Sequence, residues 1–241
     1  MSGFFFHSLQ ESLHGLRDLF FPRKCVVCGR FLSSDEQDLC AACLEELPLT
    51  YQWDIVQNAA FERLAHRFDV EAAAALFFFG AASDYRKIVY GLKYGGRRKL
   101  AVRMGYLLGA QLAGNREFRR CQAVVPVPLH PLRRWKRGYN QAEEIARGVA
   151  QAMGIPFETR LLRRHRYTRT QTRLRGAAKA KNVRGAFSCD PRRAAELQAD
   201  GIRHLLLIDD VLTTGSTLAA CAAPLTAASF RISAATLAFA G

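Results

Sequence analysis

The stretch HLLLIDDVLTTGSTLAAC, residues 204–221, joins an apolar run to a polar loop and then to an alanine-rich segment. The apolar run, residues 205–208, has the length and the bounded character of a buried parallel strand. After Ser216 the apolar side chains recur at helical spacing. The loop therefore lies at the carboxyl end of a strand and the amino end of a helix, where open α/β sheets bind their ligands.

The side chains of this loop suit a phosphorylated sugar. The amino end of a helix offers unpaired N–H groups and a positive dipole end, and Gly215 lets the backbone approach an anion closely. Four hydroxyl side chains add donors: Thr213, Thr214, Ser216 and Thr217. Asp209 and Asp210 would repel a phosphate, but they can accept hydrogen bonds from ribose hydroxyls or hold a cation. The alternative is a capped helix in which both aspartates serve only as turn and N-cap residues.

Three segments together resemble one known family. LLLIDDVLTTGST is similar to the phosphoribosyl pyrophosphate (PRPP) motif of type I phosphoribosyltransferases. VVPVPLHPLRRWKRGYNQAEEIA (124–146), RTQTRLRGAAKAKNVRGAF (169–187) and an amino-terminal four-cysteine cluster resemble the ComF family of phosphoribosyltransferase-like competence proteins. The resemblance covers about residue 20 to the end. It implies a type I phosphoribosyltransferase-like α/β fold, a parallel sheet flanked by helices, with a small N-terminal zinc ribbon.

The resemblance also implies roles for individual residues. Asp209 and Asp210 would hold the ribose hydroxyls of PRPP·Mg²⁺ as the catalytic pair. The residues that would bind the rest of the phosphoribosyl group are Val211, Thr213, Thr214, Gly215, Ser216 and Thr217. The loop 128–137 would hold pyrophosphate and the segment 163–187 would form a lid, with these residues in contact: Pro128, Leu129, Arg133, Arg137, Arg169, Arg173 and Arg184.

Plainer alternatives stay open for these two segments. Pro126 and Pro128 could merely mark a turn, and 163–187 could be a disordered basic surface loop. His130 ranks low as a general base, because a histidine next to prolines is more often a loop residue.

Four cysteines stand in two C-x-x-C pairs, in KCVVCGR and LCAACLE. Their spacing puts four thiolates within reach of one tetrahedral ion, so we expect Cys25, Cys28, Cys40 and Cys43 to bind a structural Zn²⁺. Two disulfide or redox pairs are the alternative, which a cytosolic chain disfavours. The other three cysteines are isolated, and ordinary packing accounts for them.

Charge points to a polyanionic partner. The chain has 35 Lys and Arg, 21 Asp and Glu and a formal net charge of +14. Residues 159–184 hold ten of the basic residues and no acid. Such runs suit a pyrophosphate-bearing nucleotide or nucleic acid, and charge alone does not separate these partners. We expect modest, sequence-independent single-stranded DNA binding here, with Trp135 and Tyr139 as candidate stacking rings.

The chain divides into three predicted parts: an amphipathic helix over 1–20, a zinc-ribbon module over 21–70, and a phosphoribosyltransferase-like domain over 71–241. In the last part strands near 74–79, 123–127 and 231–240 alternate with helices, and 157–162 and 185–189 are weaker strands. No segment has the roughly 18 uninterrupted apolar residues of a membrane span, and no convincing signal peptide is present. We therefore expect a soluble cytoplasmic protein.

Two classes of function remain open. One is a PRPP-binding protein linked to DNA uptake and natural transformation, with single-stranded DNA and DNA-uptake or recombination proteins as partners, as the family resemblance implies. The other is an active phosphoribosyltransferase of nucleotide metabolism without a DNA role, or a non-catalytic PRPP or nucleotide sensor. The fold does not decide between them, and the sequence names no acceptor substrate.

Overall fold

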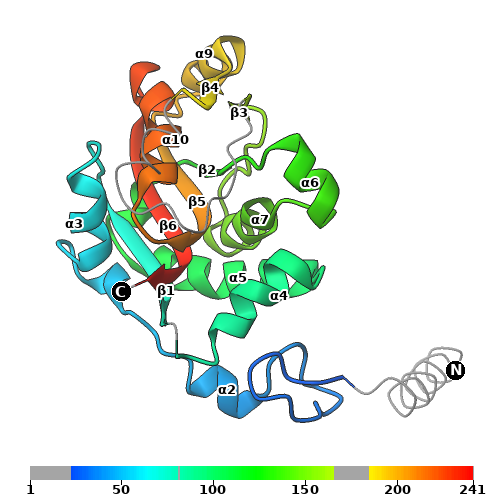
Figure 1. Ribbon diagram of the computed structural model, residues 1–241. Helices are drawn as coiled ribbons and strands as arrows, with labels where there is room; N and C mark the ends of the chain where they lie inside the picture. Colours follow the sequence, from blue (N-terminus) through cyan, green and yellow to red (C-terminus); the bar gives the residue numbers. More distant parts are fainter. Residues whose placement is uncertain (1–22, 81, 166–184, 241) are drawn as a thin grey trace, which may run out of the picture.

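The computed structural model describes residues 23–80, 82–165 and 185–240 (Figure 1). The expected helix over 1–20 and most of the expected lid, 166–184, lie outside these residues. The described helices and strands are α2 (Ala41–Glu45), η1 (Gln52–Asp54), α3 (Ala59–Ala65), β1 (Ala73–Phe79), α4 (Arg86–Tyr94), α5 (Arg98–Gly114), η2 (Phe118–Arg120), β2 (Ala123–Pro126), α6 (Pro131–Arg137), α7 (Gln141–Met153), β3 (Leu162–Arg164), β4 (Phe187–Cys189), α9 (Pro191–Ala199), β5 (His204–Leu212), α10 (Ser216–Ala227) and β6 (Arg231–Ala240).

A four-stranded parallel sheet forms the centre, in the order β1-β6-β5-β2. Alternate strand residues face opposite sides, as the pleat requires. Leu206 and Ile208 join a core with α4, α5 and α7, whereas Leu205 and Leu207 join a second core with α3, α9 and α10. Figure 1 shows these two groups of helices on either side of the strands. The predicted parallel sheet flanked by helices is therefore confirmed.

Two segments differ from expectation. β5 continues to Leu212, because β6 pairs with it along this length, so Asp209 and Asp210 lie within the strand. The segment expected as a pyrophosphate loop, 128–137, is largely the helix α6: Pro131 fits its first turn and the His130 side chain accepts a hydrogen bond from the N–H of Leu132. The expectation of an extended loop there was wrong.

The weaker strands lie outside the main sheet. β3 and β4 pair with each other antiparallel, away from the four-stranded sheet. β3 also begins at Leu162, where the expected strand over 157–162 ends. The sequence therefore predicted that this region contains extended segments, but it did not predict where β3 begins or that β3 and β4 form a separate sheet.

Residues 47–67 connect the cysteine cluster to the sheet. The N–H of Thr50 donates to the carbonyl of Leu76, and the amide of Asn58 donates to the carbonyl of Ala73, 2.8 Å away. α3 then packs on β1. These contacts tie the start of α3 to β1, and Arg63 of α3 reaches the carbonyls of Thr213 and Ala240 at the carboxyl end of the sheet. The predicted module boundary at residue 70 stays a prediction.

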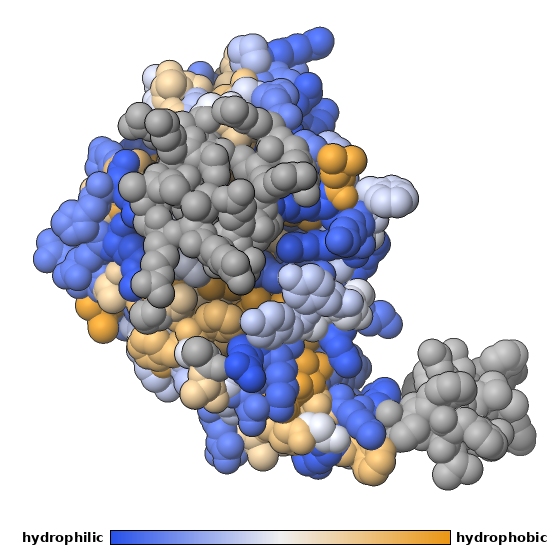
Figure 2. Space-filling model, viewed as in Figure 1, coloured by the Kyte–Doolittle hydropathy of each residue, from blue (hydrophilic) through white to orange (hydrophobic). Residues whose placement is uncertain are grey.

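No described helix is both long and apolar enough to cross a membrane. Hydrophilic side chains make up most of the face shown in Figure 2, and apolar side chains gather in smaller patches between them.

Two glycines allow α5 and α7 to cross closely. A Cβ on Gly105 would stand 2.1 Å from the carbonyl oxygen of Ile145, and one on Gly148 would stand 2.0 Å from that of Val102. No atom can occupy either position without separating the helices. The glycines therefore set the distance between the two helices that cover one face of the sheet.

Gly148→Ala should destabilise the protein by about 2–3 kcal/mol, in the range of overpacking changes, because the new methyl group meets the backbone of α5. Gly114→Ala is the matched control: it lies at the end of α5 with nothing within 4 Å of its Cβ, and it should be neutral or slightly stabilising. Urea unfolding of both variants measures the difference. Equal stabilities would contradict the close crossing.

Candidate functional site

The two aspartates stand at the carboxyl end of β5, one of the two central strands. The Nζ of Lys93, on α4, lies 3.0 Å from the Oδ2 of Asp210. The Oδ1 of Asp209 accepts a hydrogen bond from the N–H of Asp210, at 2.8 Å. Sheet and helix thus bring two carboxyl groups and one ammonium group together from positions far apart in the chain.

Burial makes Asp209 the unusual member of this pair. Desolvation, followed by the nearby charge of Asp210, raises the pKa of Asp209 from 3.8 to about 7. The Asp210 N–H, Lys93 and Arg164 oppose this shift without cancelling it. Near neutral pH the Asp209 carboxyl therefore exchanges its proton readily, as groups at functional sites often do.

Asp209→Asn should stabilise the free protein at pH 8, by on the order of 2 kcal/mol, because it removes a charge held in a desolvated position. The raised pKa means that the native state keeps a proton between about pH 4 and 7 that the unfolded chain has lost. The stability of the wild-type protein therefore falls as pH rises through this window. The stability that Asp209→Asn adds at pH 8 should accordingly be smaller at pH 5. Denaturant unfolding at both pH values measures it. Destabilisation at pH 8 would show that the carboxylate serves the fold instead.

The loop after β5 leads into an open helix end. Gly215 has a left-handed backbone, with a φ of 74°, and no side chain caps α10. The hydroxyls of Thr214 and Ser216 lie 3.0 Å apart at this end. Because neither aspartate caps the helix, the alternative in which the aspartates serve only as N-caps is wrong. The N–H groups of the first turn of α10 are the kind that bind phosphate.

α3 contributes residues that the sequence analysis missed. A Cβ on Gly215 would stand 2.7 Å from the Cδ2 of Leu64, so α3 packs directly on the loop. Arg63 donates to the carbonyl of Thr213, at 2.8 Å, and also to that of Ala240. Asn58 stands directly before a helical run, which is a local signal for the start of α3. No local pattern indicates that Arg63 of α3 contacts a loop 150 residues further along the chain.

The segment after β2 is held by polar contacts. The amide of Asn140 donates to the carbonyl of Val127, at 3.0 Å. Val127 directly precedes Pro128 and Leu129 in the sequence. Arg137 donates to Gln141, at 2.9 Å. The side chain of His130 caps α6, which supports its low rank as a base.

Arg133 and Arg164 both lie near His130. Their charges help to lower its pKa, after desolvation. Burial and the charge of Arg133 also lower the pKa of Arg164, which interacts electrostatically with Asp209. Arg164 belongs to the basic run noted in the sequence, but neither it nor Lys93 was singled out there. Only the fold brings both cations to the aspartates.

The two candidate stacking rings have different surroundings. Trp135 is 86% exposed on α6, as a stacking ring requires. Tyr139 is 3% exposed, and its hydroxyl donates to the carbonyl of Leu92 inside the protein. The expectation that Tyr139 stacks on a base was therefore wrong.

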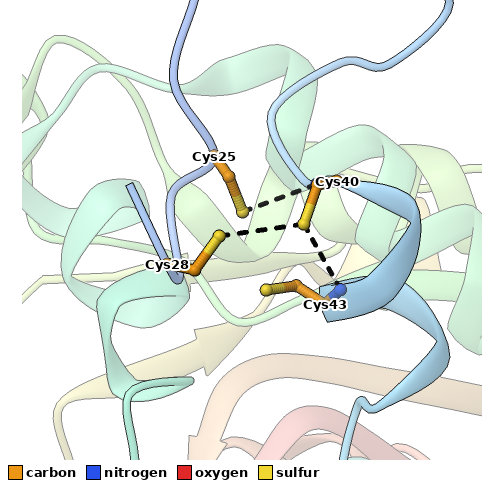
Figure 3. A group of neighbouring side chains, drawn as sticks. All are labelled: Cys25, Cys28, Cys40 and Cys43. Atoms are coloured by element: carbon orange, nitrogen blue, oxygen red, sulfur yellow. Dashed lines mark hydrogen bonds between the residues drawn. The ribbon is translucent and has the colours of Figure 1, made fainter. Parts of the chain in front are cut away.

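The four predicted metal-binding cysteines come together before and at the start of α2 (Figure 3). All four Sγ atoms lie within 4.8 Å of one another, and those of Cys28 and Cys40 are 3.8 Å apart. Zn–S bonds of about 2.3 Å give a tetrahedron with edges of about 3.8 Å. The cluster therefore fits one zinc ion with four sulfur ligands and no open position.

Backbone and charge favour the thiolate form of Cys25 and Cys40, whereas burial raises the pKa of the Cys43 thiol. The Cys40 N–H points to the Sγ of Cys25 and the Cys43 N–H to that of Cys40, each at 3.4 Å. Arg30 is the main cause of a Cys40 pKa lowered to about 6. The isolated cysteines Cys121 and Cys221 are buried, and burial raises the pKa of both thiols, as packing residues require.

The ribbon is tied to the rest of the molecule through α4. Lys87 donates to the carbonyl of Val27, at 2.7 Å, and a Cβ on Gly91 would meet the side chain of Val26 at 3.6 Å. Arg97, just beyond α4, pairs with Asp38 at 3.4 Å. One helix therefore touches the cysteine cluster at one end and Asp210 at the other.

Purified protein should contain about one equivalent of zinc, as a single four-thiolate site demands. Cys25→Ser with Cys40→Ser should lose the metal and lower the thermal stability of the chain, because bound metal contributes folding energy. Cys189→Ser is the matched control and should keep the metal. Metal analysis combined with thermal unfolding tests this. A wild-type protein that contains no zinc, and that is as stable as the same protein with zinc added, would contradict the site.

Comparisons with known proteins found one family model and distantly similar solved structures. Residues 16–53 match the model of the double zinc ribbon domain, which spans all four cysteines. Among solved structures, the glutamine PRPP amidotransferase from B. subtilis, in complex with ADP and GMP, covers 56% of this chain and 26% of its own, with 21% identity and a TM-score of 0.36.

Two curated relatives are similar in sequence. Competence protein F of Haemophilus influenzae is 34% identical over 117 residues, 48% of this chain and 49% of that protein. DNA utilization protein YhgH of Escherichia coli O157:H7 is 28% identical over 203 residues, 81% of this chain and 80% of that protein. The match thus spans about half the length of competence protein F. The chain is thus similar to competence protein F and to DNA utilization protein YhgH, and its amino-terminal part is similar to a double zinc ribbon.

Proposed function

We propose that the protein binds PRPP with Mg²⁺ at the carboxyl end of β5, in a role linked to DNA uptake. The observation that carries the proposal is the succession of Asp209 and Asp210, the left-handed Gly215 and the uncapped α10 at one edge of a parallel sheet. This edge is where α/β sheets bind ligands, and it offers acceptors for hydroxyls beside donors for a phosphate.

Each part of the ligand has a matching group. The ribose hydroxyls would donate to Asp209 and Asp210, which requires that Lys93 yield or share its contact with Asp210. Val211 and the residues 213–217 would surround the 5-phosphate. Arg133 and Arg164 would neutralise pyrophosphate, together with Mg²⁺. Of the predicted lid residues, Arg169, Arg173 and Arg184 lie outside the described part of the chain and stay predictions.

The link to DNA rests on the relatives. They are named for competence and for DNA utilization, and the net charge of +14 suits a nucleic-acid partner. We therefore propose that the protein works in the cytoplasm with single-stranded DNA and with DNA-uptake or recombination proteins.

Phosphoribosyl transfer is the second candidate. Its support is the pKa of Asp209, raised to about 7, since a group that titrates near neutral pH suits proton transfer. Fixed charges such as Arg164 could stabilise the departing pyrophosphate. A screen for pyrophosphate release with nucleobases and amines as acceptors tests this, and release with none of them would leave a binding role.

Asp209→Asn combined with Asp210→Asn should abolish PRPP binding without unfolding the protein. Each lost charge-assisted hydrogen bond to ribose should cost about 1.5–3 kcal/mol. Asp200→Asn, in an exposed turn, is the control and should bind as wild type does. Calorimetric titration with PRPP and Mg²⁺ measures the difference. If the double variant binds as well as wild type, the aspartates do not hold the ligand.

A further inference from the structure

The last two turns of α4 carry two exposed aromatic rings that the fold does not use. Tyr90 is 52% exposed and Tyr94 is 75% exposed. Their rings are stacked, with centroids 6.3 Å apart and planes 22° from parallel. Large aromatic side chains on a surface mark binding sites more often than chance packing.

One cation contacts this pair, and further cations follow it in the sequence. The guanidinium of Arg137 lies over the Tyr94 ring, 5.8 Å from its centroid. The chain continues from Tyr94 into Arg97, Arg98 and Lys99, all exposed. Lys99 forms no ion pair with any residue of the described ranges 23–80, 82–165 and 185–240, whereas Arg97 pairs with Asp38.

We propose that Tyr90 and Tyr94 form a stacking platform for the bases of a single-stranded nucleic acid, whose phosphates meet the cations of residues 97–99 at the start of α5. Sequence-independent single-strand binders combine rings for bases with a basic track for the backbone. A protein interface with similar rings would be depleted of lysine and would add aliphatic side chains. The inference deepens the DNA-linked part of the proposed function and replaces Tyr139 with two rings that are accessible.

The platform and the candidate PRPP site share the helix α4. Lys93, which contacts Asp210 at 3.0 Å, directly precedes Tyr94 in the sequence, but consecutive helix residues point in different directions. The two sites can therefore be tested separately. A free nucleotide shares the planar base with a strand but lacks the further phosphates that the cations would bind.

Fluorescence anisotropy with a labelled single-stranded oligothymidine tests the proposal in the full chain. Tyr90→Ala with Tyr94→Ala should weaken binding by roughly tenfold or more, because base–ring stacking is lost. Tyr90→Phe with Tyr94→Phe keeps both rings and should bind as wild type does. Tyr106→Ala is the matched control, since Tyr106 is also a helical tyrosine and 52% exposed.

A salt series adds a readout that a merely structural role would not give. The alanine pair removes no charge, so its plot of log affinity against log salt should run parallel to that of wild type and below it. Unchanged affinity of the alanine pair, or an equal loss in Tyr106→Ala, would overturn the platform. Competition by free thymidine monophosphate as strong as by the oligonucleotide would also overturn it, in favour of a nucleotide site.

The same variants separate this inference from the PRPP site. The alanine pair should bind PRPP as wild type does, since neither tyrosine contacts the aspartates. A wild type that binds the oligonucleotide but no PRPP would defeat the PRPP site alone. A wild type that binds PRPP but no oligonucleotide at low salt would defeat the platform alone.

Discussion

Two neighbouring carboxyl groups at the end of a central strand are the constraint around which the site is built. Asp209 is held where desolvation and Asp210 raise its pKa to about 7, so its charge is costly unless cations compensate. The cations come from separate elements: Lys93 from α4 and Arg164 from β3. We therefore expect the fold to keep in place a carboxyl group, that of Asp209, whose charge is unfavourable in the free protein, which is typical of a residue retained for a ligand.

α4 connects the parts of the molecule. Lys87 binds the backbone of the zinc ribbon, Lys93 binds Asp210, and Tyr90 and Tyr94 face solvent between two basic segments. The zinc ribbon is thus more than a separate appendage, because the helix that it holds also reaches the candidate site. A ribbon without its metal would loosen the support of Lys93.

Sequence alone predicted much of this arrangement. Local patterns predict β5, the loop after it and the four-cysteine site. These patterns are an apolar run, a glycine and two C-x-x-C pairs, and each spans only a few residues. Lys93, Arg63 and Arg164 have none, because their roles depend on which strands become neighbours. Tyr139 was expected at the surface because nothing near it in the sequence indicates that it is buried. The partner of its hydroxyl, the carbonyl of Leu92, lies 47 residues away in the chain. The helix α6 was missed because its basic residues suggested an anion loop.

Calorimetric titration of the full chain with PRPP at pH 7, with and without Mg²⁺ and in two buffers of different ionisation enthalpy, tests the central claim most directly. We predict one saturable site that needs Mg²⁺. Binding should release roughly half a proton beyond the amount released by the Asp209→Asn variant, because the carboxyl must ionise to accept the ribose hydroxyls. No saturable binding at millimolar PRPP, or the same proton release from both proteins, would contradict the assignment of Asp209 to the ligand.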